Sequence, residues 1–438
     1  MSARRNTCTA VLFLFGLLAA VVFLCFGMIP KHSGFPDAGE AEAKETQTVS
    51  PDDGAPVPLK SGEETSLPQF IEGSEPAINE LLDRNHTFIE LYGGVQRLLG
   101  RRVVEDVDPQ YTVVKLTDSV LTFASLEPEQ VDMTTRAQEM LSFAQRVERE
   151  YSVPLLYIQA PSKLNAAQLP SGIEDYSNAE ADQFLSLLQS GGVDTLDLRP
   201  LFQKASETDP DCVGTFFFHT DHHWTPAGAF LGYQAICEKL KEDYQFEIDR
   251  EWTDPDSFQR ISFEDIFLGS QGRRVGSLYA GLDDFELWSP QFSTAFTYTV
   301  PLTGIEREGP FATSLLFPER LNEIDYYNNN LYTIYAGDDY LLSRAVNLNN
   351  PSGKRILILR DSFGCALTPF LSLASSELMA IDPRNFNGDQ DAMMKFIDWL
   401  EPDIILVMNT TSSLRVDTLY PYLPTARKTV SAAQAGQN

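Results

Sequence analysis

Two hydrophobic periods alternate along most of the chain after residue 69. Apolar positions with helical spacing predict helices over residues 134–150, 179–189, 226–241, 365–374 and 391–400. Short, nearly continuous apolar runs predict buried strands over residues 154–159, 193–198, 355–359, 378–384 and 403–409, the fourth of them ending in a polar loop. Helices and strands that alternate at short spacing are typical of an α/β fold, in which helices cover both faces of a parallel sheet.

The pattern loosens between about residues 244 and 340. Aromatic residues are scattered there among Gly, Asp and Ser without a helical period, which predicts irregular structure and short antiparallel strands inserted into the α/β domain. The aromatic side chains either stack on sugars or form a small core of the insertion. Residues 269–276 are glycine-rich but lack the GK[ST] ending of a phosphate loop, so we expect a surface loop that closes over a cleft.

The N-terminal residues form two further regions. Arg4 and Arg5 precede an uncharged apolar run over residues 8–29, close to the ~20 residues that span a bilayer. We therefore expect residues 1–30 to be one uncleaved transmembrane anchor, with the rest of the chain on the far side of the membrane. The acidic, Pro- and Ser-rich residues 31–68 predict a disordered linker, which leaves residues 69–438 as the folded domain.

Charge and cysteine content limit the partners. The formal net charge of −29 argues against nucleic acid as a partner, because phosphate binding needs clustered Lys and Arg. The five cysteines form neither a metal-type C-x-x-C pair nor a disulfide framework, although Cys212 and Cys237 are candidates for one disulfide. No motif in the sequence predicts a cofactor.

Two segments carry the residues for nucleophilic catalysis. The first is His219-Thr220-Asp221-His222-His223-Trp224-Thr225-Pro226, and the second is Arg360-Asp361-Ser362-Phe363-Gly364 at the end of a buried strand. A serine on a sharp turn after a strand is typical of a presented nucleophile, and it needs an adjacent base. We predict that Ser362 is the nucleophile, His223 its base and Asp221 the carboxylate that orients the imidazole.

Other polar residues are candidates for binding the substrate or an oxyanion. Arg384 and Asn409 each follow a predicted parallel strand, and ligands bind at the carboxyl ends of such strands. His222 and Trp224 flank the predicted base and are further candidates for substrate contact. Two alternatives stay open for the histidine-rich segment: a transition-metal site, or a loop satisfied by backbone hydrogen bonds.

The two segments resemble a known family. Asp221-His222-His223-Trp224 and Asp361-Ser362-Phe363 are similar to motifs of the bacterial DHHW family, SGNH-hydrolase-like proteins related to the alginate O-acetyltransferases. Residues 160–163 and 269–276 also resemble segments of that family. The chain departs from ordinary SGNH enzymes because its Asp and His precede its Ser.

The resemblance implies a fold and a function. The fold would be an SGNH-hydrolase-like, flavodoxin-like α/β domain on the extracytoplasmic side of a bacterial cell membrane. The activity would be that of a serine-dependent O-acetyltransferase or acetylesterase acting on an exopolysaccharide or cell-wall glycan, with a membrane-bound O-acyltransferase as a partner that delivers acetyl groups. The alternatives are a non-catalytic glycan-binding or scaffold protein and a metal-dependent hydrolase.

Overall fold

The computed structural model describes residues 86–116, 120–123, 131–163, 168–208 and 212–435. The predicted anchor and linker, residues 1–68, lie outside the described residues. Within the described ranges, no helix combines the length and the apolar composition that crossing a bilayer requires.

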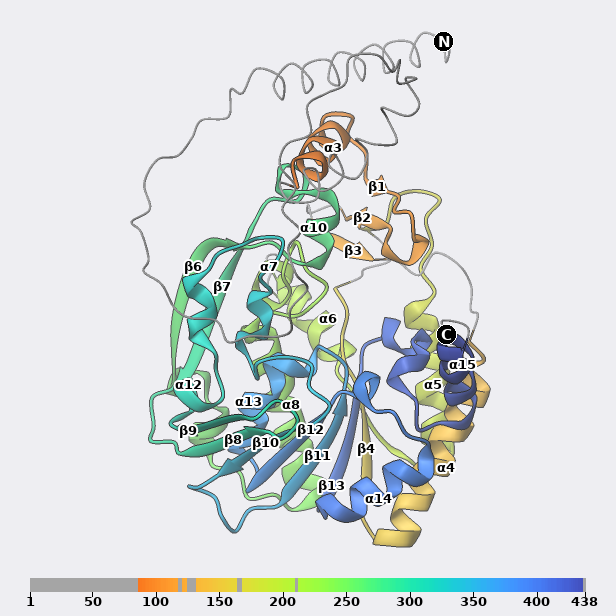
Figure 1. The fold of residues 1–438 in the computed structure, drawn as a ribbon, viewed down its shortest axis with the longest axis vertical. Helices are drawn as coiled ribbons and strands as arrows, with labels where there is room; N and C mark the ends of the chain where they lie inside the picture. Colours follow the sequence, from red (N-terminus) through yellow and green to blue (C-terminus); the bar gives the residue numbers. More distant parts are fainter. Residues whose placement is uncertain (1–85, 117–119, 124–130, 164–167, 209–211, 436–438) are drawn as a thin grey trace, which may run out of the picture. The chain divides into compact units, whose positions relative to one another are not determined.

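An eight-stranded sheet forms the centre of the fold (Figure 1). Its first five strands are parallel neighbours in the order β5 (Asp194–Asp197), β4 (Leu155–Gln159), β13 (Ile404–Asn409), β11 (Arg355–Arg360) and β12 (Glu377–Ile381). Three antiparallel strands extend it beyond β12, namely β10 (Ser343–Asn347), β8 (Phe296–Val300) and β9 (Ile305–Gly309). The predicted α/β fold is thus confirmed, but the sheet is mixed and not wholly parallel, because strands of the expected insertion join it.

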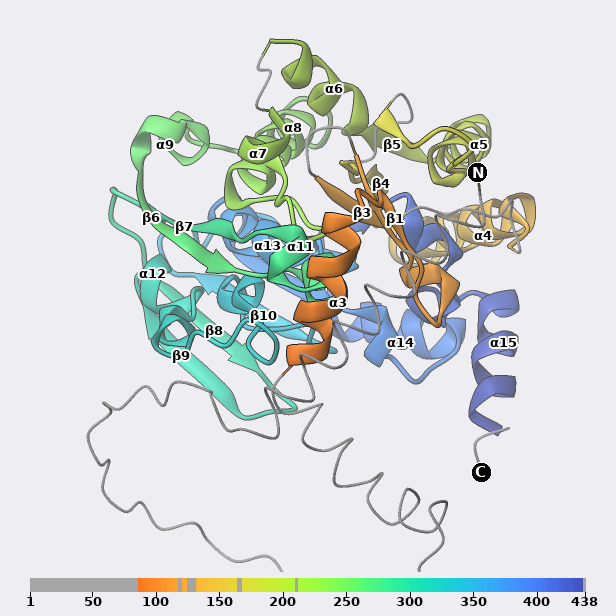
Figure 2. The same cartoon turned by 90° about the horizontal axis from the view of Figure 1, so that it is seen from above.

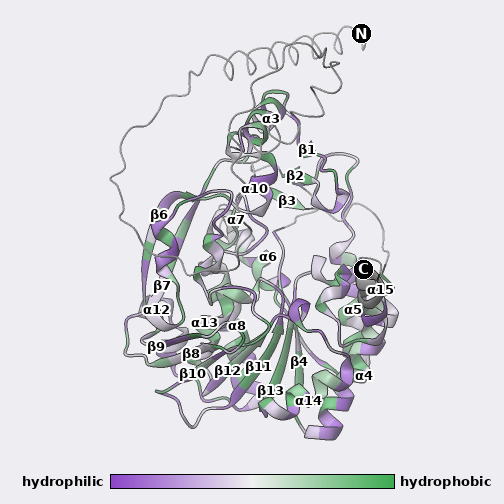
Figure 3. Cartoon of the chain, viewed as in Figure 1, coloured by the Kyte–Doolittle hydropathy of each residue, from purple (hydrophilic) through white to green (hydrophobic). Residues whose placement is uncertain are grey.

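Helices cover both faces of this sheet (Figure 2). One face packs against α4 (Met133–Tyr151), α5 (Ser177–Ser190), α14 (Gln390–Leu400) and α15 (Pro424–Ala435). The other face packs against α8 (Pro226–Tyr244), α13 (Gly364–Leu373) and α6 (Arg199–Thr208). Side chains alternate between the two faces along each strand, so consecutive residues of the central strands enter different hydrophobic clusters. Figure 3 shows the resulting concentration of hydrophobic residues on the central strands.

Capping side chains explain where two of the helices begin. The carboxylate of Asp132 accepts a hydrogen bond from the amide of Thr134 at the start of α4. Thr225 accepts one from the amide of Gly228 at the start of α8, where Pro226 has no N–H and therefore needs no acceptor. The predicted start of this second helix is therefore confirmed, and it fixes the point at which the histidine-rich segment ends.

The insertion has its own two-stranded antiparallel sheet and a buried aromatic layer. Strands β6 (Phe258–Phe267) and β7 (Asp283–Pro290) pair with each other in a two-stranded sheet. The aromatic side chains of the insertion are mostly buried, and Phe258 and Trp288 pack against rings of α8 and α13. The buried aromatic residues include Phe258, Phe267, Phe285, Trp288, Phe296 and Tyr298. Of the two interpretations of these aromatics, the small core is correct for these six, because buried rings cannot stack on a sugar.

Three short strands and one helix lie at the N-terminal end of the described residues. Helix α3 (Thr87–Leu98) is followed by the sheet of β1 (Val103–Val104), β2 (Val113–Lys115) and β3 (Leu121–Phe123). The amide of Leu121 in β3 donates to the carbonyl oxygen of His219 at 2.9 Å. This small sheet therefore contacts the histidine-rich segment directly.

The parallel strands bring their carboxyl ends to one edge of the central sheet. Arg360 lies opposite Met408, and Asn409 lies opposite Gln159, so β11, β13 and β4 end side by side. The turns that follow these strands therefore converge, and Ser362 lies in one of them.

Candidate active site

The two segments singled out in the sequence meet at this edge. His223 and Ser362 are separated by 139 positions in the chain, yet Nε2 of the histidine lies 2.7 Å from Oγ of the serine. Nδ1 of the same ring is hydrogen-bonded to the carboxylate of Asp221. The imidazole thus bridges a carboxylate and a hydroxyl, which is the geometry that lets a histidine take a proton from a serine.

The carboxylate of Asp221 is held by more than the imidazole. Oδ1 also accepts from the amide of His223 at 2.9 Å, and Oδ2 accepts from the amide of Ser270 at 2.5 Å. Burial alone raises the pKa of Asp221, but His223, His222 and the Ser270 amide outweigh it and hold that pKa well below its usual range. Asp221 is therefore an anion at neutral pH, as required of a group that stabilises an imidazolium ion.

A second aspartate shapes the serine turn. The carboxylate of Asp361 accepts from the amide of Phe363 at 3.0 Å, from the amide of Thr410 at 2.8 Å and from the hydroxyl of Ser413 at 2.6 Å. It ties the turn after β11 to the turn after β13. Ser362 is partly exposed between the buried residues Asp361 and Phe363, at the N-terminal end of α13. A hydroxyl in this position faces solvent and lies near the positive end of a helix dipole.

Two large aromatic side chains also hold the serine turn, through the carbonyl oxygen of Phe363. The indole Nε1 of Trp224 and the hydroxyl of Tyr332 each donate to the carbonyl oxygen of Phe363 at 3.0 Å. The ring of Tyr332 also stacks on the imidazole of His223, with centroids 3.9 Å apart and planes 14° from parallel. Trp224 is fully buried, so it positions the serine turn, and the prediction that it contacts substrate is wrong.

Residues 269–276 support the aspartate and do not form the expected surface loop. They form helix α10 (Ser270–Val275), which packs against the histidine-rich segment. The amide of Gly269 donates to Oγ1 of Thr220, and the amide of Gly272 donates to its carbonyl oxygen, both at 2.8 Å. A Cβ atom on Gly269 would lie only 2.1 Å from Cβ of Asp221. Glycine is required here because the two backbones approach closely.

Asp283, at the start of β7, anchors the histidine-rich segment from the insertion. Its carboxylate accepts from the amides of His219 and Thr220 at 2.7 and 2.8 Å and from the Thr220 hydroxyl at 2.6 Å. Neither Asp283 nor Tyr332 was singled out in the sequence. Both lie in the stretch without a regular period, where no local signal distinguishes them from their neighbours.

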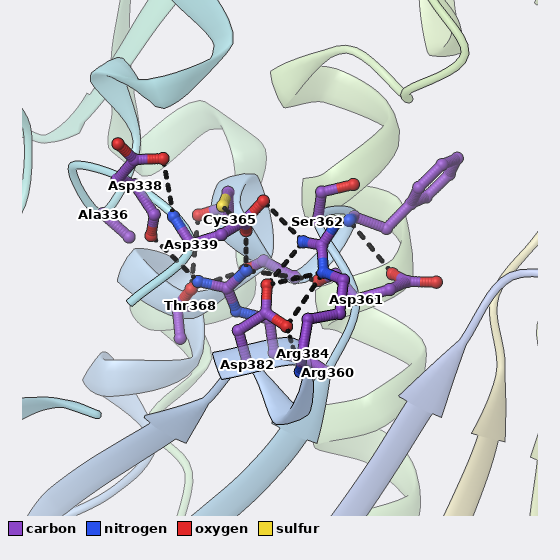
Figure 4. Close-up of polar contacts among 12 residues, drawn as sticks. Ala336, Asp338, Asp339, Arg360, Asp361, Ser362, Cys365, Thr368, Asp382 and Arg384 are labelled. Carbon is purple, nitrogen blue, oxygen red and sulfur yellow. Dashed lines mark hydrogen bonds and ion pairs between the residues drawn. The ribbon is translucent and has the colours of Figure 1, made fainter. Parts of the chain in front are cut away.

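A network of two arginines and two aspartates lies beside the serine turn (Figure 4). The buried guanidinium of Arg360 pairs with Asp339 and donates to the carbonyl oxygens of Asp338 and Asp361 at 3.1 and 3.3 Å. Arg384 bridges the same Asp339 to Asp382, using Nε and Nη2. Burial alone would raise the pKa of Asp339, but the two guanidinium groups hold it well below its usual range.

Two of the four predicted binding residues, Arg384 and Asn409, lie near the carboxyl ends of β12 and β13. Arg384 is 37% exposed but already pairs with two carboxylates, so its cationic charge is largely compensated. Asn409 is buried, and its side chain lies on the sheet face opposite that of Met408, whose side chain packs on the α8 face. Alternation along β13 thus directs the Asn409 side chain away from the face on which α13 and its serine turn lie, and its role at an oxyanion stays a prediction.

His222 lies next to the predicted base. Its Nδ1 is 2.7 Å from Oγ of Ser270, and its ring centroid is 3.8 Å from that of His223. Packing around the ring, followed by the charge of His223, lowers the pKa of His222, although 38% of its side chain is exposed. A neutral imidazole that reaches solvent beside the serine is suited to contacting a substrate, which stays a prediction.

One group of side chains within the described ranges has the composition of a metal site. The ligand atoms of Asp221, His222 and His223 lie within 4.8 Å of one another. In the structure these atoms bond to one another, to Ser270 and to Ser362. Metal binding would therefore have to break the hydrogen bonds that align the serine.

The cysteines give no disulfide where they are described. Cys237 and Cys365 are both buried free thiols. The pairing of Cys212 with Cys237 that the sequence left open is therefore excluded.

Comparison with known proteins identifies a family model and a relative that are similar to part of this chain. The sequence model of the family described as SGNH hydrolase-like domain, acetyltransferase AlgX matches residues 123–252, which include the Asp-x-His-Trp motif. Alginate biosynthesis protein AlgX of Pseudomonas aeruginosa is 26% identical over 167 residues, 35% of this chain and 34% of AlgX. The matched part thus spans about a third of that relative's length.

Two solved structures share the fold. PatB1 of Bacillus cereus, determined with a sulfonyl adduct, superposes with a TM-score of 0.57 at 20% identity over 72% of this chain and 98% of PatB1. A DHHW family protein from Eubacterium siraeum superposes with a TM-score of 0.53 at 19% identity over 74% of this chain and 99% of that one. The resemblance to the DHHW and AlgX-related proteins predicted from the motifs is confirmed, and the chain has an SGNH hydrolase-like fold.

Proposed function

We propose that this protein is a serine-dependent O-acetyltransferase or acetylesterase that acts on an exopolysaccharide or cell-wall glycan. The observation that carries the proposal is the imidazole of His223, which bridges the carboxylate of Asp221 and the hydroxyl of Ser362. The matching family is described as an acetyltransferase, which supports an acetyl group as the one transferred. The relative AlgX is an alginate biosynthesis protein, which supports a polysaccharide as the acceptor.

The geometry supports a two-step reaction. Ser362 attacks the carbonyl carbon of an acetyl donor while His223 takes its proton, and the donor leaves with that proton as the tetrahedral intermediate collapses. The acetyl-serine is then attacked by a sugar hydroxyl or by water, whose proton passes through the same imidazole back to Ser362. Asp221 stays ionised throughout and stabilises the imidazolium ion in both steps.

The placement of the protein is part of the proposal. Residues 8–29 would anchor it in a bacterial membrane as a single pass, with the catalytic domain on the extracytoplasmic side. A membrane-bound O-acyltransferase would then deliver the acetyl group across the bilayer. Protease accessibility of the domain in intact spheroplasts tests this placement, and protection of the domain would contradict it.

Turnover of a chromogenic acetyl ester tests the chemistry. Ser362→Ala should lower kcat by about 10⁴-fold or more, and the double variant with His223→Ala should lose little further, because the residues act as a unit. Ser186→Ala, a change of an exposed serine on α5, is the matched control and should behave as wild type. Near-wild-type activity of folded Ser362→Ala would remove the serine mechanism.

An oligosaccharide acceptor added to the same assay separates the two activities. Acetylated sugar among the products indicates a transferase, and free acetate alone indicates an esterase. Binding of oligosaccharide without any ester turnover would instead support the non-catalytic alternative.

The metal-dependent alternative rests on the grouping of Asp221, His222 and His223. It predicts a stoichiometric transition metal in the purified protein and loss of turnover on chelation. Turnover that is unaffected by chelation and abolished in Ser362→Ala would exclude it.

A further inference from the structure

A buried lysine holds the backbone of the histidine-rich segment. Lys163 follows β4 and is only 6% exposed. Its ammonium group donates to the carbonyl oxygens of Phe218 at 2.8 Å, of His219 at 3.1 Å and of Asp221. An ammonium group has three donors, so all of them are used on one short stretch of main chain.

These carbonyl groups converge because the segment forms a closed loop. Phe217 and Trp224 pair as an isolated antiparallel bridge, and the amide of Phe218 donates to the carbonyl oxygen of His223 at 3.3 Å. The residues between the two ends must turn within this loop, which directs several carbonyl oxygens toward one point. Oxygen dipoles that face one another repel unless a cation or a set of donors lies between them.

The charges around Lys163 match this arrangement. Burial lowers the pKa of Lys163 to about 7, while the carboxylates of Asp283 and Asp221 favour its charged form. The protonated ammonium group is thus the counter-charge to the two buried carboxylates that hold the loop, one from the insertion and one within the loop. It acts on the loop through main-chain atoms.

The loop in turn sets the direction of the predicted base. Asp221 contributes its carbonyl oxygen to Lys163 and its carboxylate to the ring of His223. A shift of the backbone at this residue therefore moves the carboxylate, and the imidazole that it orients, relative to Ser362. Placement errors of about 1 Å in a catalytic group lower rates by about 100-fold.

We propose that Lys163 is a positioning residue: its ammonium group ties the carbonyl oxygens of residues 218, 219 and 221 together so that Asp221 and His223 stay aligned with Ser362. This role rests on the proposed function. Lys163, which follows β4, would thus contribute to catalysis without contacting the substrate.

Chemical rescue tests the proposal in the full-length protein. Lys163→Ala removes the atoms of a propylammonium ion, and it should lower kcat for the acetyl ester by about 100-fold with KM little changed. Added propylammonium should restore at least about tenfold of that loss, because it returns the cation to the carbonyl groups. Lys354→Ala is the matched control, since Lys354 donates to a single carbonyl oxygen, that of Tyr244, in another part of the fold. It should keep wild-type activity with and without the amine.

A second readout does not depend on turnover. The downfield proton resonance of Nδ1–H of His223, assigned by its loss in His223→Gln, reports the hydrogen bond to Asp221. It should disappear in Lys163→Ala and return with propylammonium. If the wild-type protein shows the resonance but turns over no ester, the proposed function fails. The effect of Lys163→Ala on the resonance then still tests whether Lys163 aligns Asp221 and His223.

Two results would overturn the positioning role. One is wild-type turnover and resonance in Lys163→Ala, and the other is a folded Lys163→Ala that regains neither on addition of the amine. If the alanine variant does not fold, Lys163→Arg and Lys163→Met carry the test. Arginine, which keeps the charge, should retain the resonance and methionine should lose it, and equal behaviour of the two variants would contradict the proposal.

Discussion

Replacing Gly269 with alanine tests whether the packing of α10 sets the geometry of Asp221. The added Cβ would lie 2.1 Å from Cβ, 2.5 Å from Cα and 2.6 Å from Oδ2 of Asp221. Gly269 has φ −77° and ψ −179°, an extended conformation that alanine adopts freely, so the effect is purely steric. Two of the three contacted atoms cannot rotate away, so the two backbones must separate.

The size of the effect follows from the contacts that separation breaks. Overpacking costs about 1–3 kcal/mol, and losing the bond from the Ser270 amide to the Asp221 carboxylate costs about 1.5–3 kcal/mol, together about 2.5–6 kcal/mol. A shift of the carboxylate by about 1 Å should also lower kcat by about 100-fold. The free energy of unfolding is measured by urea denaturation, and kcat by turnover of an acetyl ester.

A second glycine provides the matched control. Gly94 lies within α3, and its nearest neighbours to an added Cβ are atoms of Leu278 at 3.5 and 3.8 Å, an ordinary contact distance. Gly94→Ala should therefore leave turnover unchanged and stabilise the protein by up to about 1 kcal/mol. If Gly269→Ala matched this control in both stability and turnover, the argument that α10 holds Asp221 in place would be refuted.

Two further predictions follow from the groups around the serine turn. Trp224→Phe removes a buried donor to the Phe363 carbonyl and part of a packed ring. Urea denaturation should therefore show a free energy of unfolding lowered by about 2–4 kcal/mol, and kcat should fall. Unchanged values would contradict the positioning role of the indole. Asp339→Asn leaves Arg360 without its charged partner and should destabilise the protein at pH 7 by about 3–5 kcal/mol. Because the pKa of Asp339 is lower in the folded than in the unfolded chain, its contribution to stability is fully present above the unfolded value of about 4 and is lost as the pH falls below it. The difference between wild type and Asp339→Asn should thus shrink from pH 6 to pH 3, and a constant difference would argue against the linkage.

Local periodicity was enough to predict the central α/β elements. The spacing of apolar residues placed α8 and β11 correctly because each buries a continuous set of side chains that is visible in the sequence. The joining of β8 and β10 to the sheet edge was not predictable in this way. It depends on which distant strand each one pairs with, and hydrophobic spacing carries no information about the partner.

The difference between local signals and long-range contacts also explains which residues of the site could be predicted from the sequence. Asp221, His223 and Ser362 could be named because each lies at a position with a local signal, a helix start or a turn after a strand. Asp283 accepts from the amides of His219 and Thr220, and Tyr332 stacks on the ring of His223, but only the folded chain brings these residues of the insertion there. The glycines of residues 269–276 do not form the surface loop that their composition predicts, because glycine marks close backbone approach as well as an exposed loop.

The two outermost strands of the central sheet bear on self-association. A bare sheet edge recruits strands from other copies of a chain, and charged side chains on the edge discourage this pairing. β5 ends the sheet with Asp194 and Asp197, and β9 ends it with Glu306 and Glu308. Asp194 and Asp197 already pair with Lys239 and Arg199, so the repulsion comes mainly from β9. Two copies that aligned this strand would bring the exposed Glu306 and Glu308 of each copy close together, so the protein should resist growth of an intermolecular sheet at this edge even when it is crowded.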